Sequence, residues 1–166
     1  QTVLARVAGL SANRNVLQSL YRGTTAPMME VHMNPRDVVF PPGRQALYEI
    51  NRYSPAIRSN GFLFVSGQVG SREDGSPEPD LETQVRTAFN NLNAILRAAG
   101  CSFDDVIDVT VFIVDPQSTF ETIWQVIPEF WGDAPHPTLT GVGVTWLYGF
   151  QFEIKVIARL PETASS

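Results

Sequence analysis

Glu153 is the carboxylate of this sequence whose setting best suits chemistry. It lies between Phe152 and Ile154, so a strand through this run would point it away from its apolar neighbours. Held in a cleft, such a carboxylate can act as a general acid or base. On a solvated strand face it would have no such role, and the residues by themselves leave both interpretations open.

The other reactive side chains offer less. Cys101 is the single cysteine and has no obvious neighbour that would lower its pKa, so we expect a buried thiol and not a nucleophile. Lys155 is the single lysine, hence the single candidate for a Schiff base. His32 and His136 lie in unrelated contexts, and a zinc site needs several ligands at set spacing. Phosphate-binding loops and nucleophile elbows are missing from the sequence, so we expect neither a metal nor a cofactor.

Hydrophobic periodicity predicts the elements that would position these residues. Leu81–Ala99 carries its apolar residues on one helical face and stops at Gly100. Val106–Val114 alternates and is rich in β-branched residues, which predicts a strand. A second helix begins at Asp115-Pro116, and Pro128 inside its apolar pattern should kink it or end it early.

The remaining segments predict further strands, a turn and a loop. Ser66-Gly67-Gln68 is typical of a turn, and Arg72–Asp80 of a surface loop. The other predicted strands are Gln45–Asn51, Ala56–Arg58, Phe62–Val65, Thr138–Trp146 and Phe150–Ala158. This order predicts an α+β fold with both helices on one face of the sheet. The second face would then need cover, which predicts an oligomer.

Length and charge exclude several classes. A chain of 166 residues suits one domain with a sizeable core. Its 12 basic and 17 acidic residues give a net charge of −5, which argues against a nucleic-acid partner. Apolar runs all fall short of the roughly 18 residues that a membrane helix needs, so we expect no membrane partner.

The amino-terminal segment differs in composition from the rest. Residues 1–28 hold three arginines and no acid, which leaves 9 basic and 17 acidic residues, a charge of −8, for the remainder. Such a segment resembles an organellar transit peptide; the alternative is an upstream extension or an added segment ahead of a start near Met28, Met29 or Met33. We therefore expect an extension over 1–34, a domain over 35–161 and a tail over 162–166, in a cytoplasmic protein unless the extension directs it to an organelle.

A set of short motifs carries a family resemblance. They are, in order, Tyr53 to Ile57, Leu63 to Gln68, Asn91-Leu92 with Ala98 to Gly100, Asp108 to Phe112, and Phe152 to Ile154 with Ile157-Ala158. Over about residues 38–161 they resemble the RidA/YjgF family of enamine/imine deaminases, also called the L-PSP endoribonuclease family. Three stretches are most similar to its YjgH branch: Phe40 to Gln45, Ser66 to Pro79 and Phe152 to Arg159.

The resemblance implies a fold and a chemistry. The fold would be chorismate-mutase-like, a six-stranded mixed sheet with two helices, assembled as a homotrimer around a central barrel. A small-molecule ligand would bind in clefts between adjacent subunits. Deaminases of the family hold a 2-imino or 2-enamino acid through an arginine that pairs with its carboxylate. A water molecule held by a glutamate then hydrolyses the imine to a 2-oxo acid and ammonia.

At one important position the sequence departs from the family. The Pro-x-Arg-Ser/Thr segment falls on Pro137–Thr140, and the arginine position is Leu139, which cannot pair with a carboxylate. Trp124 occupies a position that is often asparagine in the deaminases. The resemblance assigns Glu153 as the catalytic residue and six positions as substrate-binding, namely Tyr53, Ser66, Gly67, Trp124, Leu139 and Gly141.

Two function classes follow for a pocket that suits a small neutral or cationic molecule. One is a deaminase-like imine or enamine hydrolase with altered specificity and Glu153 as acid/base. The other is a non-catalytic ligand-binding or protein-interaction trimer that keeps the scaffold. A ribonuclease, which the family's second name suggests, is disfavoured by the charge of −8 outside the amino-terminal segment.

Overall fold

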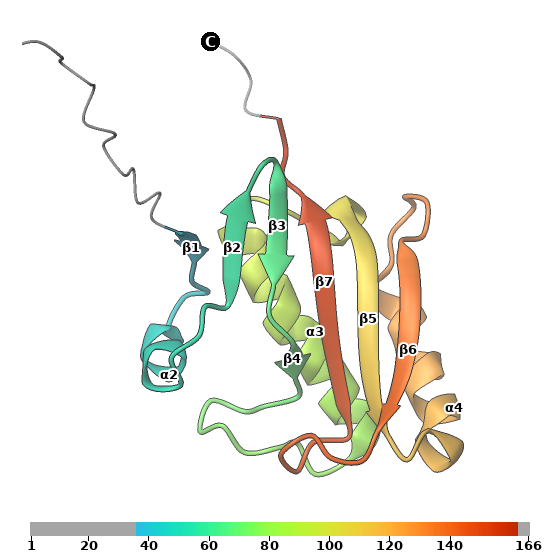
Figure 1. Ribbon diagram of the computed structural model, residues 1–166. Helices are drawn as coiled ribbons and strands as arrows, with labels where there is room; N and C mark the ends of the chain where they lie inside the picture. The colour runs from blue at the N-terminus through green and yellow to red at the C-terminus, as the bar shows by residue number, and fades with distance from the viewer. Residues whose placement is uncertain (1–35, 163–166) are drawn as a thin grey trace, which may run out of the picture. The chain divides into compact units, whose positions relative to one another are not determined.

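The computed structural model describes residues 36–162, in which one sheet is packed against helices (Figure 1). The predicted extension over 1–34 and most of the predicted tail lie outside the described residues, so these boundaries stay predictions. The elements are β1 (Asp37–Val39), α2 (Gln45–Ile50), β2 (Ala56–Ser59), β3 (Phe62–Val65), β4 (Gln68–Val69), α3 (Leu81–Ala98), a 3₁₀ turn (Phe103–Asp105), β5 (Val106–Val114), α4 (Pro116–Val126), a second 3₁₀ turn (Ile127–Phe130), β6 (Thr138–Val144) and β7 (Phe152–Arg159).

The sheet is mixed and has the order β1-β2-β3-β7-β5-β6. Among the strands of residues 36–162, β5 and β6 run parallel and the other pairs are antiparallel. Six strands across agree with the six-stranded sheet that the resemblance implies. The additional strand β4 has two residues and also pairs with β7, so it continues the line of β3 after the Ser66-Gly67 turn (Figure 1).

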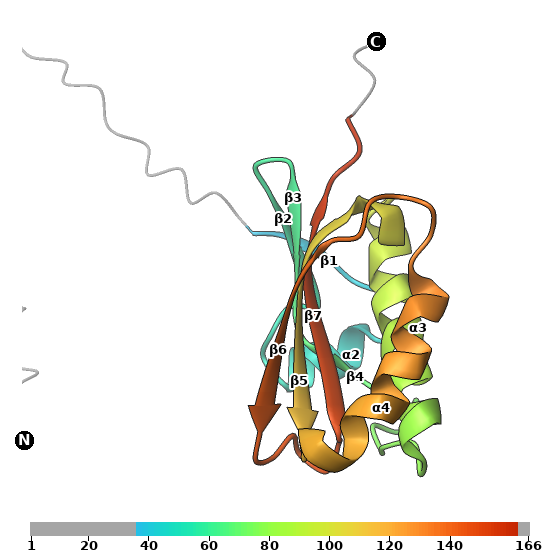
Figure 2. The ribbon, with the colours of Figure 1, turned by 90° about the vertical axis from the view of Figure 1, so that its right-hand side faces the viewer.

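Both long helices cover the same face of the sheet, as predicted (Figure 2). The side chain of Asp80 caps the start of α3 by accepting a hydrogen bond of 2.8 Å from the backbone N–H of Thr83. The buried face of α3 centres on Phe89, which is fully buried and whose ring stacks on Phe130 at 4.4 Å and on Phe152 at 6.1 Å. Aromatic packing between helix and sheet therefore forms the centre of the core.

Pro128 ends the second helix early. Regular α4 stops at Val126, and the chain continues as the 3₁₀ turn Ile127–Phe130. Proline lacks the N–H that an α-helix interior requires and clashes with the preceding turn, which explains the change. The sequence prediction for this position is confirmed.

The predicted strand over Gln45–Asn51 is wrong, because Gln45–Ile50 forms helix α2. A strand would place Tyr48 and Ile50 on the same face, yet Tyr48 is 2% exposed and Ile50 is 80% exposed. Apart from Tyr48 and Ile50, the segment consists of good helix formers, and the Gln45 side chain donates to the Glu49 carboxylate one turn away, at 2.7 Å. In so short a segment, helix propensity and local hydrogen bonding decide the structure.

The face of the sheet opposite the long helices carries exposed apolar side chains. Phe64 on β3 is 47% exposed, and Val142 on β6, which pairs with Phe112 on β5, is 36% exposed. Phe64 and Phe112 alternate with buried neighbours that face the helices. The oligomer that would cover this face stays a prediction. Within residues 36–162 no helix combines the length and the hydropathy needed to cross a membrane.

Candidate functional site

The turn at Ser66-Gly67 is fixed by hydrogen bonds to the segment before β2. The Ser66 hydroxyl donates to the Ser54 carbonyl at 2.7 Å, and the Ser66 N–H donates to the Pro55 carbonyl at 2.9 Å. The buried side chain of Gln68 donates to the carbonyls of Ser66 at 2.9 Å and Gly67 at 3.1 Å. The position of the turn is thus defined by partners on both sides.

Tyr48 on α2 supports the same turn. Its hydroxyl donates to the Gln68 side-chain oxygen at 3.3 Å, and its ring meets Tyr53 edge-on at 5.1 Å. Neither Tyr48 nor Gln68 was among the predicted site residues. A buried hydrogen bond between Tyr48 and Gln68 would have indicated them, but it can be inferred only once α2 is known to be a helix.

Glu153 lies on the face of the sheet that the long helices leave uncovered, between the buried residues Phe152 and Ile154. Its orientation away from these neighbours is confirmed. The side chain is half-buried, and burial raises the pKa of Glu153 above its usual value because the charged form loses solvation. Within residues 36–162 its carboxylate has neither a hydrogen bond nor an ion pair, so it is available to a ligand.

Gly67 allows the Glu153 carboxylate to approach the turn. A Cβ built on Gly67 would overlap the Glu153 side chain, with its Cγ only 3.0 Å away. Any other residue at this position would displace the carboxylate. The Ser-Gly pair therefore does more than form a turn, since it shapes the space in which Glu153 lies.

Tyr53 is close enough to Glu153 for the charge of this carboxylate to change the pKa of the phenol. Burial raises the pKa of the Tyr53 phenol, and the negative charge of Glu153 raises it further. A phenol with a raised pKa stays protonated at neutral pH and can donate a hydrogen bond to a bound molecule.

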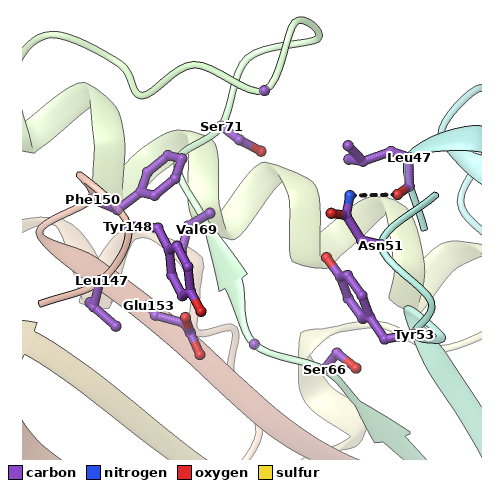
Figure 3. Close-up of a pocket in the computed structure, with 12 residues that line it drawn as sticks. Leu47, Asn51, Tyr53, Ser66, Val69, Ser71, Leu147, Tyr148, Phe150 and Glu153 are labelled. Atoms are coloured by element: carbon purple, nitrogen blue, oxygen red, sulfur yellow. Dashed lines mark hydrogen bonds between the residues drawn. The ribbon is translucent and has the colours of Figure 1, made fainter. Parts of the chain in front are cut away.

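These residues line one cavity of about 600 Å³ (Figure 3). Tyr148, Phe150 and Glu153 stand on one side, and Asn51, Tyr53 and Ser66 stand on the other (Figure 3). The full lining is Leu47, Asn51, Tyr53, Ser66, Gly67, Val69, Ser71, Gly75, Leu147, Tyr148, Phe150 and Glu153. It contains one carboxylate and no basic side chain. Such a lining is suited to a neutral or cationic, partly apolar molecule.

The segment of residues 69–72, part of which lines this cavity, is fixed by hydrogen bonds from side chains outside the cavity. Asn91 on α3 donates to the carbonyls of Val69 at 2.9 Å and Ser71 at 3.1 Å. Arg44 donates to the carbonyls of Ser71 at 3.1 Å and Arg72 at 2.7 Å. The guanidinium of Arg44 is thus bound to backbone and lines a different surface hollow, so it does not supply the missing carboxylate anchor.

The remaining predicted residues lie elsewhere on the same chain. Trp124 and Leu139 line a second hollow of about 290 Å³ together with Ile127, Pro128, Trp131, His136 and Pro137. Leu139 pairs in register with the buried Val109, so it points to the helix side of the sheet. Gly141 follows on the same side, where a Cβ would lie 3.8 Å from Val111, and it lines neither cavity. Within one chain the predicted site is therefore divided in two.

Two residues that sequence reasoning left out, Tyr148 and Phe150, form the apolar wall beside Glu153. The sequence predicts Trp146 and Phe150 as the ends of two strands that meet around Tyr148-Gly149, whereas the strands end at Val144 and begin again at Phe152. Cys101 is buried, as predicted, and burial raises the pKa of its thiol. Lys155 is exposed on β7 and does not line the cavity. Across residues 36–162, groups of three or more metal-ligating side chains are missing.

Comparison with known proteins identifies the family. The endoribonuclease L-PSP model matches residues 43–160. YjgH of Escherichia coli K12, a RutC family protein, is 64% identical over 127 residues, covering 76% of this chain and 97% of YjgH. TdcF of E. coli K12, by its name a candidate reactive intermediate deaminase, is 34% identical over 113 residues, covering 66% of this chain and 87% of TdcF.

Solved structures agree with these sequence matches. The YjgH structure has a TM-score of 0.73 at 63% identity and covers 77% of this chain and 98% of its own. The structure of E. coli TdcF with bound serine has a TM-score of 0.61 at 34% identity and covers 64% of this chain and 87% of its own. The resemblance seen in the motifs is confirmed, and the chain belongs to the endoribonuclease L-PSP family, that of the RidA and YjgF proteins.

Proposed function

We propose that the protein hydrolyses small imines or enamines that lack a carboxylate group, with Glu153 as the acid/base residue. The observation that carries this proposal is a half-buried carboxylate with a raised pKa, in a cavity of about 600 Å³ whose lining has no basic side chain. A 2-imino acid would find no positive partner there. A protonated imine would find a negative one.

The proposed reaction needs only water and the residues of the cavity. The substrate is the protonated imine: Glu153 takes a proton from water as the water oxygen bonds to the imine carbon, and the C=N electron pair moves to nitrogen, which becomes a neutral amine. Glu153 then gives this proton to the nitrogen of the carbinolamine. The C–N bond breaks, the hydroxyl proton passes to the departing ammonia, and a carbonyl compound and ammonium remain. General acid–base help of this kind contributes roughly 10²- to 10⁴-fold.

We further propose that the cleft is completed by a neighbouring subunit of a homotrimer. The half with Tyr53, Ser66, Gly67 and Glu153 and the half with Trp124, Leu139 and Gly141 lie apart on one chain. Clefts between subunits, which the family resemblance implies, would bring the two halves together. The exposed apolar face of the sheet is a further reason to expect assembly.

A trimer gives a direct prediction. Light scattering at micromolar concentration should give three times the chain mass of 18.3 kDa. A mass equal to one chain would contradict the assembly and leave Leu139 far from any ligand of Glu153.

Substrate choice gives a second prediction. We expect 2-iminobutanoate to be hydrolysed at least about tenfold less efficiently than butan-2-imine, in which methyl replaces the carboxylate. A charge-assisted hydrogen bond to a carboxylate contributes about 1.5–3 kcal/mol, and Leu139 cannot make one. Ammonia release from imines generated in the assay measures both rates.

The matched variant for this comparison is Leu139→Arg. It should narrow the difference between the two substrates by raising the rate with 2-iminobutanoate. If the unmodified protein hydrolyses 2-iminobutanoate as well as butan-2-imine, another residue holds the carboxylate and the proposed substrate class is wrong.

The alternative is a non-catalytic ligand-binding or protein-interaction trimer, and the leucine at the arginine position favours it. Binding of imines or amines with no ammonia release would support this alternative. Nucleic acid as a ligand is disfavoured by the net charge of −5. Location in the cytoplasm likewise stays a prediction.

A further inference from the structure

The connection between β6 and β7 contains a tight turn from Leu147 to Phe150. The Phe150 N–H donates to the Leu147 carbonyl at 2.9 Å, and these two residues form an antiparallel bridge. Both central residues have positive φ, 53° at Tyr148 and 91° at Gly149. This is the backbone of a type I′ turn, in which asparagine, aspartate or glycine is favoured at the first central position.

Tyrosine is an unfavourable residue at that first position. A bulky side chain at positive φ is strained, and strain of this kind concentrates at functional sites. Burial does not offset it, because Tyr148 is 80% exposed in the chain. The Tyr148 ring packs on the Trp146 ring, 4.0 Å away centre to centre, and also lines the cavity.

The turn places two aromatic side chains in the same cavity as one carboxylate. Tyr148 lies next to Glu153, and Phe150 lies farther along the same side of the cavity (Figure 3). Aromatic faces attract a planar apolar group and also a cation placed over them. The carboxylate attracts a protonated nitrogen. Together they match a ligand whose cationic nitrogen is attached next to an aromatic ring.

We propose that the Tyr148 turn selects aromatic imines, which are protonated at nitrogen and bound between Glu153 and the rings of Tyr148 and Phe150. This inference rests on the proposed function for the reaction and adds the class of substrate. The ring of Tyr148 sets specificity, and Glu153 supplies charge to any cationic ligand, aromatic or not.

Benzamidine and acetamidine test this proposal, because they carry the same planar cation with and without a phenyl ring. By titration calorimetry, the protein should bind benzamidine at least about tenfold more tightly than acetamidine. Tyr148→Asn should bring the two affinities to within about threefold by weakening benzamidine alone. Tyr148→Phe should keep the preference, since the ring remains.

Stability separates loss of the ring from loss of the fold. Tyr148→Asn creates the Asn-Gly pair that suits a type I′ turn, so its melting temperature should equal or exceed that of the unmodified protein. Ile50→Ala is the matched control, since Ile50 is equally exposed at 80% and does not line the cavity. It should leave both affinities unchanged.

These experiments separate the selection of aromatic ligands by Tyr148 from the hydrolysis of imines by Glu153. A benzamidine preference that Tyr148→Asn removes, with no imine turnover, supports the inference and contradicts the proposed enzyme. Imine turnover with equal affinity for the two amidines contradicts the inference and supports the enzyme. A preference that survives Tyr148→Asn also overturns the inference, because the ring would then have no part in selection.

Discussion

Replacing Glu153 by glutamine is expected to lower the rate of imine hydrolysis about 100-fold or more. The same change should raise the melting temperature at pH 7. Glutamine has nearly the same shape but can neither accept the proton of water nor return it, and general acid–base catalysis contributes roughly 10²- to 10⁴-fold. The stability gain follows because the charged Glu153 is half-buried, lacks a partner among the described residues and has a raised pKa. Ammonia release and thermal melting measure the two effects.

The gain in stability should depend on pH in a defined direction. A carboxyl whose pKa is raised by folding binds a proton more readily in the folded state than in the unfolded state. The charged Glu153 therefore destabilises the folded protein at neutral pH, and this penalty disappears as the pH falls below the pKa of the unfolded chain. Melting curves of the two proteins should differ at pH 7 and converge near pH 4. Equal melting temperatures throughout would contradict the burial of this carboxylate.

Gly67→Ala is the companion variant because it leaves Glu153 chemically intact. Its new methyl group would occupy the space of the Glu153 carboxyl, which lies at the end of a flexible side chain and can move. We expect a large loss of hydrolysis with little loss of stability. Full activity in Gly67→Ala would mean that the observed position of Glu153 against the turn is not needed for the reaction.

Phe89→Ala is expected to have the largest effect on stability, a loss of about 3–5 kcal/mol. Phe89 is fully buried on α3, and its ring contacts four aromatic residues, namely Phe103, Phe130, Trp131 and Phe152. Removing the ring leaves a cavity between helix and sheet that rigid neighbours cannot fill. Urea unfolding at a fixed protein concentration measures the loss, since an oligomer makes stability depend on concentration.

Phe89→Leu is the graded control for this prediction. Leucine retains part of the buried volume, so its loss should be smaller than that of alanine. Equal losses in the two variants would indicate that ring stacking, and not volume, dominates at this position. A loss below about 1 kcal/mol in Phe89→Ala would contradict the central place of Phe89 in the core.

Long periodic segments could be predicted from the sequence, and short ones could not. Helix α3 and strand β5 repeat their pattern over 18 and 9 residues, which leaves little ambiguity between helix and strand. Helix α2 has 6 residues, too few to distinguish the two periods. The 2-residue strand β4 has no pattern of its own and exists because the Ser66-Gly67 turn returns the chain to β7.

For the site, sequence reasoning found the residues that belong to motifs and missed those that only the fold brings together. The orientation of Glu153 and the Ser66-Gly67 turn followed from the residue pattern, the family resemblance added their roles in the site, and the fold brings them together. Tyr148 was missed because its role depends on a positive φ, which no pattern of hydrophobicity encodes. The distance of Leu139 from Glu153 within one chain was equally invisible, because a sequence does not separate contacts within a subunit from contacts between subunits.

The two-residue turn at Tyr148-Gly149 also bears on how such proteins diverge. One wall of the cavity is built into strands and tied by Asn91 and Gln68, where a change would disturb the sheet. On the side of Glu153, by contrast, part of the wall is the tip of an exposed turn, at Tyr148, which has no part in the core. Substitutions at this tip therefore cost little folding stability and meet little purifying selection on that ground. A lineage can then exchange one ligand for another in a few mutational steps. Among descendants of a common ancestor, variation at this turn should follow differences in ligand more closely than overall divergence does.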